Sequence, residues 1–151
     1  MLIKIKEEVL ISSFIFFLFF IIIYIEDKKK KGIKIMETIF IYLDDERDLP
    51  HFWEIRLKKW NIKYMIFRKA TDLMRFLKEN SNKYKIFISF DHDLGYGETG
   101  YDIAKYIVEN NIFIKGFTVH SMNPVGAKNI INLLTHYGYH KIDNAAEIQN
   151  A

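Results

Sequence analysis

The sequence predicts an α/β protein with a parallel β-sheet that is covered by helices on both faces. Short runs of apolar, β-branched and aromatic residues alternate with helical patterns, and the connections between them are short. This alternation is typical of right-handed βαβ units. The chain has 151 residues and no cysteine, so one core is expected and disulfides or Cys-ligated zinc are excluded.

Continuous apolar runs predict the strands, because a parallel strand is buried on both faces. The clearest example is "TIFIYL" at residues 38–43, which is followed by an acidic stretch. A weak fifth candidate is "YHKI" at residues 139–142. The predicted strands therefore span residues 38–43, 62–67, 85–90, 116–120 and, less clearly, 139–142.

Helical periodicity predicts a helix after each of the first four strands. The last of these has the clearest start, with Asn123 at the N-cap position and Pro124 at the first helical position. Asp48, just before Leu49 and Pro50, is interpreted as a helix cap. The predicted helices span residues 51–60, 70–80, 99–111 and 123–138.

Residues 9–25 form an uncharged N-terminal segment of seventeen residues, at the short end of what spans a bilayer. We interpret residues 1–35 as a single-pass anchor with a basic linker, and residues 36–151 as the folded domain. The lysines at 28–31 and 34 then place that domain in the cytoplasm. The alternative is translation from Met36, which gives a soluble cytoplasmic protein.

The charge is divided unevenly along the chain. Residues 1–35 contain seven lysines and four acidic residues, while residues 36–151 contain fifteen basic and fifteen acidic residues. The domain therefore lacks the positive charge that general DNA binding through phosphate contacts requires.

Polar residues gather where the predicted strands end. Asp44 and Asp45 follow the first strand, "DHD" at residues 91–93 follows the third, and the fourth ends in His120 and Ser121. In a parallel α/β sheet these ends form the usual ligand site. A single Asp there is often only a helix cap or turn former, and a single His often only makes a hydrogen bond. Several carboxylates in one cleft require neutralisation, and Mg²⁺ is the cation that oxygen ligands favour.

Several motifs resemble those of two-component receiver domains. "IYLDDERDLP" resembles the receiver start, Asp91 with Leu94 and Gly95 resembles the phosphoacceptor segment, and Ser121 stands at the receiver Ser/Thr position. The combination of "LDDER", "DHDLG", "TGYD" and "HSMNPVGA" is more similar to the cyclic-phosphate-processing receiver-like family. Over residues 37–142 the resemblance implies a flavodoxin-like, five-stranded parallel sheet of order 2-1-3-4-5. The receiver Lys has only Lys141 as a candidate, without its usual Lys-Pro context.

The resemblance implies a role in recognising or hydrolysing cyclic phosphates on nucleotides or RNA ends. Asp91, His92 and His120 would be catalytic, with the two imidazoles as general acid and base. Ser121 and Asn123 would bind phosphate, and the metal ligands would be Asp44, Asp45, Asp91 and Asp93. The alternatives are a phosphoacceptor module with Asp91 as nucleophile, and a metal- or phosphate-binding domain without turnover.

Overall fold

The computed structural model describes residues 14–27, 36–95 and 97–150. The chain divides into two compact units, Met1–Ile35 and Met36–Ala151.

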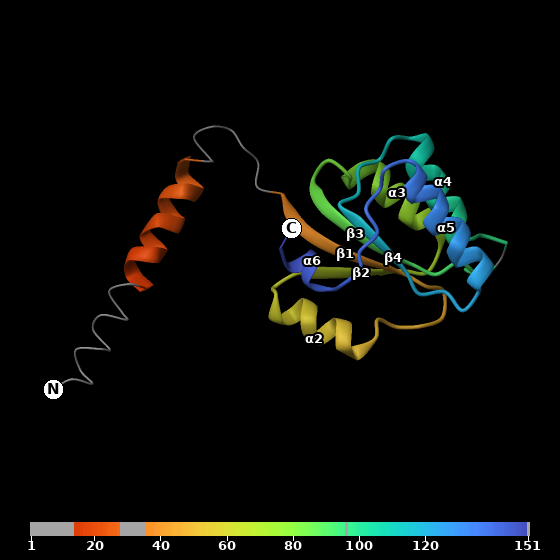
Figure 1. The fold of residues 1–151 in the computed structure, drawn as a ribbon, viewed down its shortest axis with the longest axis horizontal. Helices are drawn as coiled ribbons and strands as arrows, with labels where there is room; N and C mark the ends of the chain where they lie inside the picture. Colours follow the sequence, from red (N-terminus) through yellow and green to blue (C-terminus); the bar gives the residue numbers. More distant parts are fainter. Residues whose placement is uncertain (1–13, 28–35, 96, 151) are drawn as a thin grey trace. The chain divides into compact units, whose positions relative to one another are not determined.

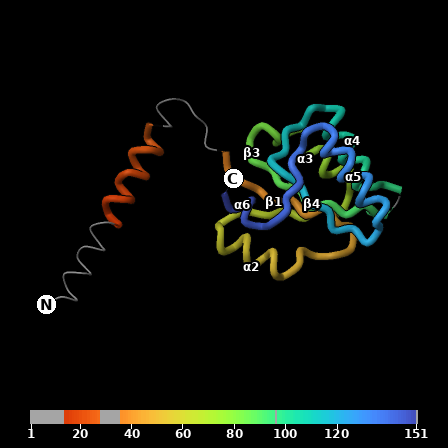
Figure 2. Tube along the Cα trace, in the orientation of Figure 1, coloured from red at the N-terminus to blue at the C-terminus, as the bar shows by residue number. Residues whose placement is uncertain are grey.

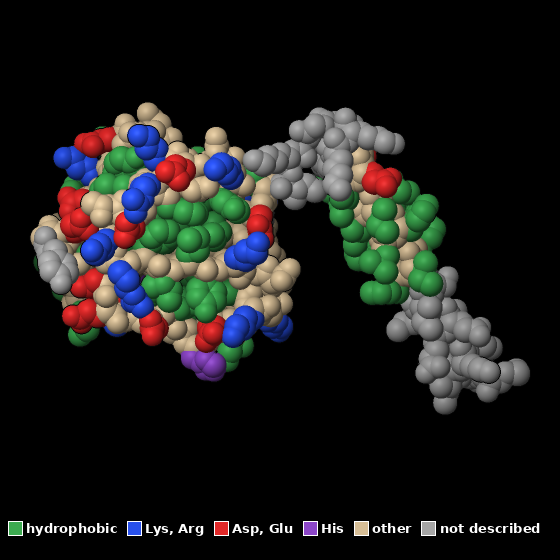
Figure 3. Space-filling view, turned by 180° about the vertical axis from the view of Figure 1, so that it is seen from behind, with side chains coloured by type: hydrophobic (Ala, Val, Ile, Leu, Met, Phe, Trp, Pro, Cys, Tyr) green, Lys and Arg blue, Asp and Glu red, His purple; other side chains and the backbone are tan. Residues whose placement is uncertain are grey.

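In the first unit, residues 14–27 form a helix whose large apolar side chains are mostly exposed (Figure 3). Within the described parts of the chain, no helix combines the length and the apolar character needed to cross a membrane. This finding corrects the prediction of a membrane anchor over residues 9–25 and of a membrane-anchored location. Residues 9–13 of that segment lie outside the described residues.

The second unit contains a parallel sheet of four strands in the order β2-β1-β3-β4 (Figure 1). The strands β1 and β3 are its two central members, and both are buried over their last five residues. Continuous burial on both faces explains why their sequences are apolar without alternation. The strands are β1 (Glu37–Leu43), β2 (Lys63–Phe67), β3 (Tyr84–Phe90) and β4 (Gly116–Val119).

The predicted fifth strand is wrong as an element of the sheet. In the described residues only one isolated parallel bridge, between Phe117 and Lys141, represents it. The backbone N–H of Phe117 donates to the carbonyl of His140, and that of Ile142 donates to the carbonyl of Phe117. The segment therefore lies beside β4 at the expected position, but it pairs over too few residues to form a strand.

Helices cover both faces of the sheet (Figures 1 and 2). They bury two apolar clusters against it. The larger cluster joins one face of the sheet to α3, α4 and α5, and the smaller joins the other face to α2 and α6. Because successive strand residues point to opposite faces, Ile39 and Ile41 enter the larger cluster, whereas Phe40 and Tyr42 enter the smaller. The helices are α2 (His51–Lys59), α3 (Ala70–Asn80), α4 (Gly100–Glu109), α5 (Pro124–His136) and α6 (Ala146–Gln149).

Candidate functional site

Asp44, Asp91 and His120 form a row across the carboxyl edge of the sheet. Leu43 pairs with Phe90 and Phe90 with Val119, so the residues that follow these three lie side by side. Backbone hydrogen bonds continue the ladder by one residue, from Asp91 N–H to the carbonyl of Leu43 and from His120 N–H to that of Phe90. The row brings one ligand atom from each of the three side chains within 4.8 Å of the others.

Asp44 is the most enclosed member of the row, with no exposed surface. Its Oδ1 accepts the backbone N–H of Glu46 at 3.0 Å and of Arg47 at 2.6 Å. Burial alone raises the pKa of Asp44, but these backbone hydrogen bonds, the bond to His120 and the charge of Arg47 outweigh it. The pKa therefore lies below its usual value, and Asp44 is a carboxylate at neutral pH.

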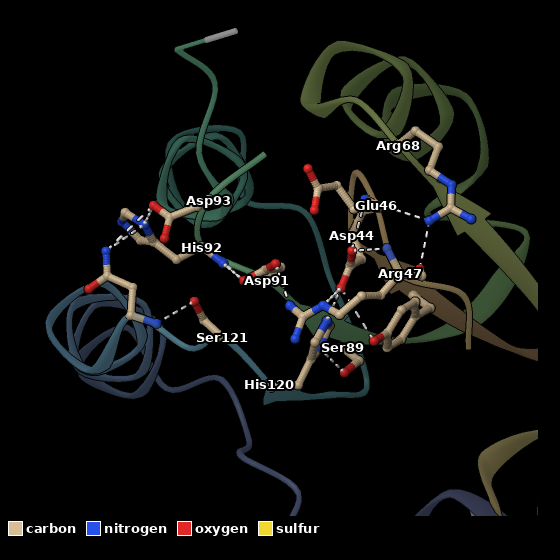
Figure 4. A network of polar contacts seen from close by, with 12 residues as sticks. Asp44, Glu46, Arg47, Arg68, Ser89, Asp91, His92, Asp93, His120 and Ser121 are labelled. Atoms are coloured by element: carbon tan, nitrogen blue, oxygen red, sulfur yellow. Dashed lines mark hydrogen bonds and ion pairs between the residues drawn. The ribbon is translucent and has the colours of Figure 1, made fainter. Parts of the chain in front are cut away.

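The side chain of Arg47 bridges the two carboxylates of the row (Figure 4). Its Nε lies 2.7 Å from Asp44 Oδ2, and its Nη2 lies 2.6 Å from Asp91 Oδ2. Charge-assisted bonds of this length are strong, and the single positive charge of Arg47 offsets one of the two negative charges. Sequence reasoning missed Arg47 as a site residue, although an arginine three positions after a buried aspartate was visible in "DDERD".

His120 is held on both sides of its ring. Nδ1 lies 2.7 Å from Ser89 Oγ, and Nε2 lies 3.2 Å from Asp44 Oδ2. The carboxylate can only accept, so Nε2 carries the proton and Nδ1 accepts from the Ser89 hydroxyl. Burial lowers the pKa of His120, although the hydrogen bond to Asp44 and the nearby carboxylates oppose that shift. A neutral imidazole with both nitrogens occupied is suited to positioning Asp44.

The small side chain of Ser89 makes this arrangement possible. Ser89 pairs with Tyr42 on one side and with Thr118 on the other, so it lies between β1 and β4. The rings of Tyr42 and His120 stack on each other beside it, with centroids 4.3 Å apart and planes at 12°. Burial and the charge of Asp44 raise the pKa of Tyr42 to about 12, so its phenol remains protonated and donates weakly to Asp44 at 3.4 Å.

His92 and Asp93 form a second polar group, on the other side of Asp91 (Figure 4). His92 Nδ1 lies 2.8 Å from Asp93 Oδ1, and this hydrogen bond lowers the pKa of Asp93. Within the described residues no buried side-chain nitrogen or oxygen lacks a partner, and the hydrogen bonds of the His92 ring there involve Nδ1 and not Nε2. The lone pair of Nε2 therefore faces solvent.

The first turn of α5 holds His92 in place. Asn123 caps this helix by accepting the backbone N–H of Gly126 at 2.9 Å, and its amide lies 3.5 Å from both His92 Nδ1 and Asp93 Oδ1. Ser121 Oγ accepts the backbone N–H of Asn123 at 3.1 Å. The hydroxyl proton of Ser121 is therefore free to bind an acceptor at the mouth of the site.

A tight turn holds Asp91 against the start of α4. A Cβ on Gly100 would lie 1.9 Å from the carbonyl oxygen of Asp91, so only glycine fits there. The N–H of Gly100 donates to the carbonyl of His92 at 2.7 Å, and Thr99 and Asp102 form a capping box. The "TGYD" motif thus fixes the backbone around Asp91.

The structure separates the residues predicted from sequence into two groups. Asp44, Asp91 and His120 lie together, while His92, Asp93 and Asn123 lie together beside them, with Ser121 next to Asn123. Asp45 belongs to neither group, because its Oδ2 faces the turn at Gly95. Asp48 does not cap a helix as predicted: the N-cap of α2 is Pro50, and Asp48 pairs with Arg68.

The donor set fits a hard divalent cation on one condition. Asp44 and Asp91 offer carboxylate oxygens, which Mg²⁺ prefers, and the third member of the group, His120, already uses its nitrogens elsewhere. The condition is that the guanidinium of Arg47, which contacts both carboxylates, moves away.

The parallel sheet of order β2-β1-β3-β4 and the acidic row at its carboxyl edge define the class of receiver-like α/β domains. The sequence of residues 39–136 matches the family described as the cyclic-phosphate processing receiver domain. The match covers more than half of the chain, so the protein belongs to this family, and the resemblance inferred from the motifs is confirmed.

A solved structure supports the fold. The chain is similar to the signal receiver domain of a protein described as a Luxo repressor from Vibrio parahaemolyticus, with a TM-score of 0.52 and 17% identity over 74% of this chain and 83% of that one. It is also similar to the response regulator LqsR of Legionella pneumophila, with a TM-score of 0.48 and 13% identity over 74% of this chain and 40% of that one. No curated protein sequence matches the chain.

Proposed function

We propose that the domain contains a Mg²⁺-dependent phosphate site, at which it binds and hydrolyses cyclic phosphates on nucleotides or RNA ends. The observation that carries this proposal is the row of Asp44 and Asp91, two carboxylates that share one cationic side chain at the carboxyl edge of the sheet. Such a site suits a cation and, through it, a phosphoryl group. Membership of the cyclic-phosphate processing family supports the substrate class.

Asp44 and Asp91 are the proposed metal ligands. The bound metal would offset negative charge on the phosphoryl oxygens during displacement. His120 and Ser89 act on Asp44, because the chain of hydrogen bonds from Ser89 through His120 to Asp44 fixes the direction of its carboxylate. In this assignment His120 is a positioning residue, and Asp93 orients His92 by accepting a hydrogen bond from its Nδ1.

His92 is the proposed general base. Asp93 accepts a hydrogen bond from Nδ1–H of His92, so the lone pair of the ring is on Nε2, which faces solvent. His92 would take a proton from water as the water oxygen forms a bond to phosphorus. The bond from phosphorus to the 2′ or 3′ oxygen breaks, solvent protonates that oxygen, and His92 returns its proton to solvent. One water is consumed, and the product is a phosphomonoester.

Ser121 and Asn123 border the same opening. The Ser121 hydroxyl is a donor for a phosphoryl oxygen, because its own oxygen already accepts from Asn123 N–H. The amide of Asn123 lies near both His92 and Asp93 and keeps that pair beside the phosphate.

The test is hydrolysis by the purified full chain. We expect Mg²⁺-dependent conversion of 2′,3′-cyclic AMP, or of an RNA oligonucleotide with a 2′,3′-cyclic end, followed by ³¹P NMR and mass spectrometry. EDTA and the substitution Asp91→Asn are expected to abolish it. Binding of these ligands without turnover would reduce the proposal to a phosphate-binding domain, and neither binding nor turnover would refute it.

A phosphoacceptor role for Asp91 is the second candidate, favoured by the position of this carboxylate at the end of the central strand β3 in a receiver-like fold. Three contacts count against it. Lys141 pairs with Asp143 at 3.2 Å, and both oxygens of Asp91 already accept hydrogen bonds, from His92 N–H and Arg47. A mass increase of one phosphate on Asp91 after treatment with acetyl phosphate would support the phosphoacceptor role.

A further inference from the structure

Arg47 occupies the position that a metal ion would need. Its guanidinium contacts Asp44 and Asp91 at 2.7 Å and 2.6 Å, and these are the two oxygen-bearing members of the only group of metal-ligating side chains found in the described residues. Two cations cannot share this space without strong repulsion. Binding of a divalent ion to both carboxylates therefore requires that the guanidinium leave.

The surroundings of Arg47 allow the side chain to leave while the backbone remains. Its N–H donates to Asp44 Oδ1 at 2.6 Å, and its carbonyl accepts from Arg68 Nη1 at 2.6 Å. These two bonds anchor the main chain from both sides. The Arg47 side chain, in contrast, is 42% exposed, and its only partners among the described residues are the two carboxylates.

The phosphoryl group of the ligand is the expected partner of the released guanidinium. A guanidinium binds phosphoryl oxygens through two parallel N–H bonds, the geometry in which arginine exceeds lysine. The backbone anchor keeps Arg47 at the rim of the site, next to the carboxylates that would then hold the metal.

We propose that Arg47 is an exchangeable counter-ion, which bridges Asp44 and Asp91 in the free protein and passes to the phosphoryl ligand when a divalent ion replaces it. This inference rests on the proposed function for its phosphoryl half, whereas the exchange with metal stands on the geometry alone. It makes Arg47 a phosphate-binding residue. It also couples the two binding events: the metal releases the guanidinium for the phosphoryl ligand, and the phosphoryl ligand removes the guanidinium from the carboxylates that bind the metal.

The first experiment follows the exchange directly. In ¹⁵N-labelled full chain, the Nε–H resonance of Arg47 reports its bond to Asp44. We expect Mg²⁺ alone to shift this resonance and increase its exchange with water, and inorganic phosphate added to the Mg²⁺-loaded protein to restore its protection. An Nε–H resonance that is unchanged at saturating Mg²⁺ would overturn the proposal.

The second experiment measures Mg²⁺ affinity by calorimetry with and without inorganic phosphate. Without phosphate, Arg47→Gln is expected to bind Mg²⁺ at least about fivefold more tightly than the natural sequence, the low end for linked sites. Phosphate is expected to tighten Mg²⁺ binding in the natural sequence and to have a clearly smaller effect in Arg47→Gln, where only its contacts to the metal and to Ser121 remain. Arg75→Gln is the matched control, because Arg75 is an exposed helix residue that pairs with Asp72.

The two proposals fail in different ways. A purely structural role of Arg47 predicts that Arg47→Gln weakens Mg²⁺ binding, and this result, or equal affinities, would overturn the exchange. Exchange of Arg47 with neither binding nor hydrolysis of any cyclic phosphate would refute the proposed function and leave the exchange standing. If Arg47→Gln is unfolded without metal, a rise in its melting temperature with Mg²⁺ that exceeds that of the natural sequence supports the proposal, and absence of such rescue overturns it.

Discussion

The imidazole of His92 fills the space where Gly126 has no side chain. A Cβ built on Gly126 would lie 2.2 Å from Cγ and 2.3 Å from Cδ2 of the His92 ring. These distances are far inside van der Waals contact, so the first turn of α5 and the end of β3 fit each other only with glycine at this position. The position of His92 therefore depends on a residue 34 positions away in the chain.

Gly126→Ala is the sharpest test of this contact. Alanine favours a helix interior by about 1 kcal/mol over glycine, but the overlap with His92 is expected to cost about 1–3 kcal/mol. We expect a small net loss of stability in urea unfolding, a shifted His92 ring resonance in NMR, and a loss of cyclic phosphate hydrolysis. Lys128→Ala, on an exposed position of the same helix, is the control and should change none of these. Full activity of Gly126→Ala would refute the dependence of His92 on this glycine.

Asp44→Asn and Asp91→Asn are expected to differ in stability while sharing a functional defect. Asp44 is fully buried and accepts from backbone and side chains alike, and an asparagine amide would place donors against donors. We expect Asp44→Asn to lower the free energy of unfolding by about 2–3 kcal/mol, and the loss is no larger because the partner Arg47 is partly exposed. We expect Asp91→Asn to lower it by about 1 kcal/mol. Both variants are expected to bind Mg²⁺ weakly in calorimetry. Equal losses in urea unfolding would contradict the distinct structural role of Asp44.

The metal-free protein is expected to lose stability as the pH falls below 6.5. Burial lowers the pKa of His120 below this usual value in the folded protein, so the unfolded chain binds the proton more readily. Between the lowered pKa and 6.5 the unfolded state takes up more protons, and the free energy of unfolding decreases as the pH falls. One group contributes at most about 1.4 kcal/mol per pH unit.

Urea unfolding at several pH values between 8 and 5 measures this effect. His120→Gln is expected to flatten the dependence on pH, whereas His136→Gln, at an exposed position, should leave it unchanged. Parallel curves for His120→Gln and the natural sequence would exclude His120 as the source.

Ile148→Ala is expected to destabilise the domain by about 2–3 kcal/mol. Although α6 has only four residues, Ile148 is 1% exposed and belongs to the apolar cluster beneath α2. The estimate lies in the lower part of the usual range for Ile→Ala, because a short helix near the chain end relaxes easily. Val125→Ala, which is largely exposed, should change the urea midpoint little. A negligible effect of Ile148→Ala would show that α6 contributes nothing to the core.

The sequence was sufficient for the elements whose pattern is local. The helix predicted over residues 70–80 is α3 (Ala70–Asn80), and the strand predicted over residues 62–67 is β2 (Lys63–Phe67). The fifth strand failed because a strand is defined by pairing with a neighbour, which a four-residue segment with only two apolar side chains does not determine. The short helix α6 has no periodicity to detect.

The candidate site was predictable in part for the same reason. Asp44, Asp91 and His120 each follow a recognisable strand, so the rule that strand ends converge was enough to bring them together. The contact of Arg47 with Asp91 spans 44 positions and depends on the path of an irregular loop. The roles of Asp45 and Asp93 could not be separated by sequence, because adjacent residues in a turn point in directions that only the backbone determines.

The row of Asp44, Asp91 and His120 also bears on how the sheet selects its pairing during folding. Ser89 and Asp91 follow the face of β3 that carries Phe87, while Ile88 and Phe90 enter the opposite cluster. A slip of one residue between β1 and β3 would move every side chain to the wrong face. It would place Ser89 among the apolar side chains beneath α3 and α4, away from His120, which bonds to both Ser89 and Asp44. The same polar side chains that form the site thus destabilise folding intermediates with the wrong register. Correct pairing of the strands and correct assembly of the site should therefore be selected together before folding is complete.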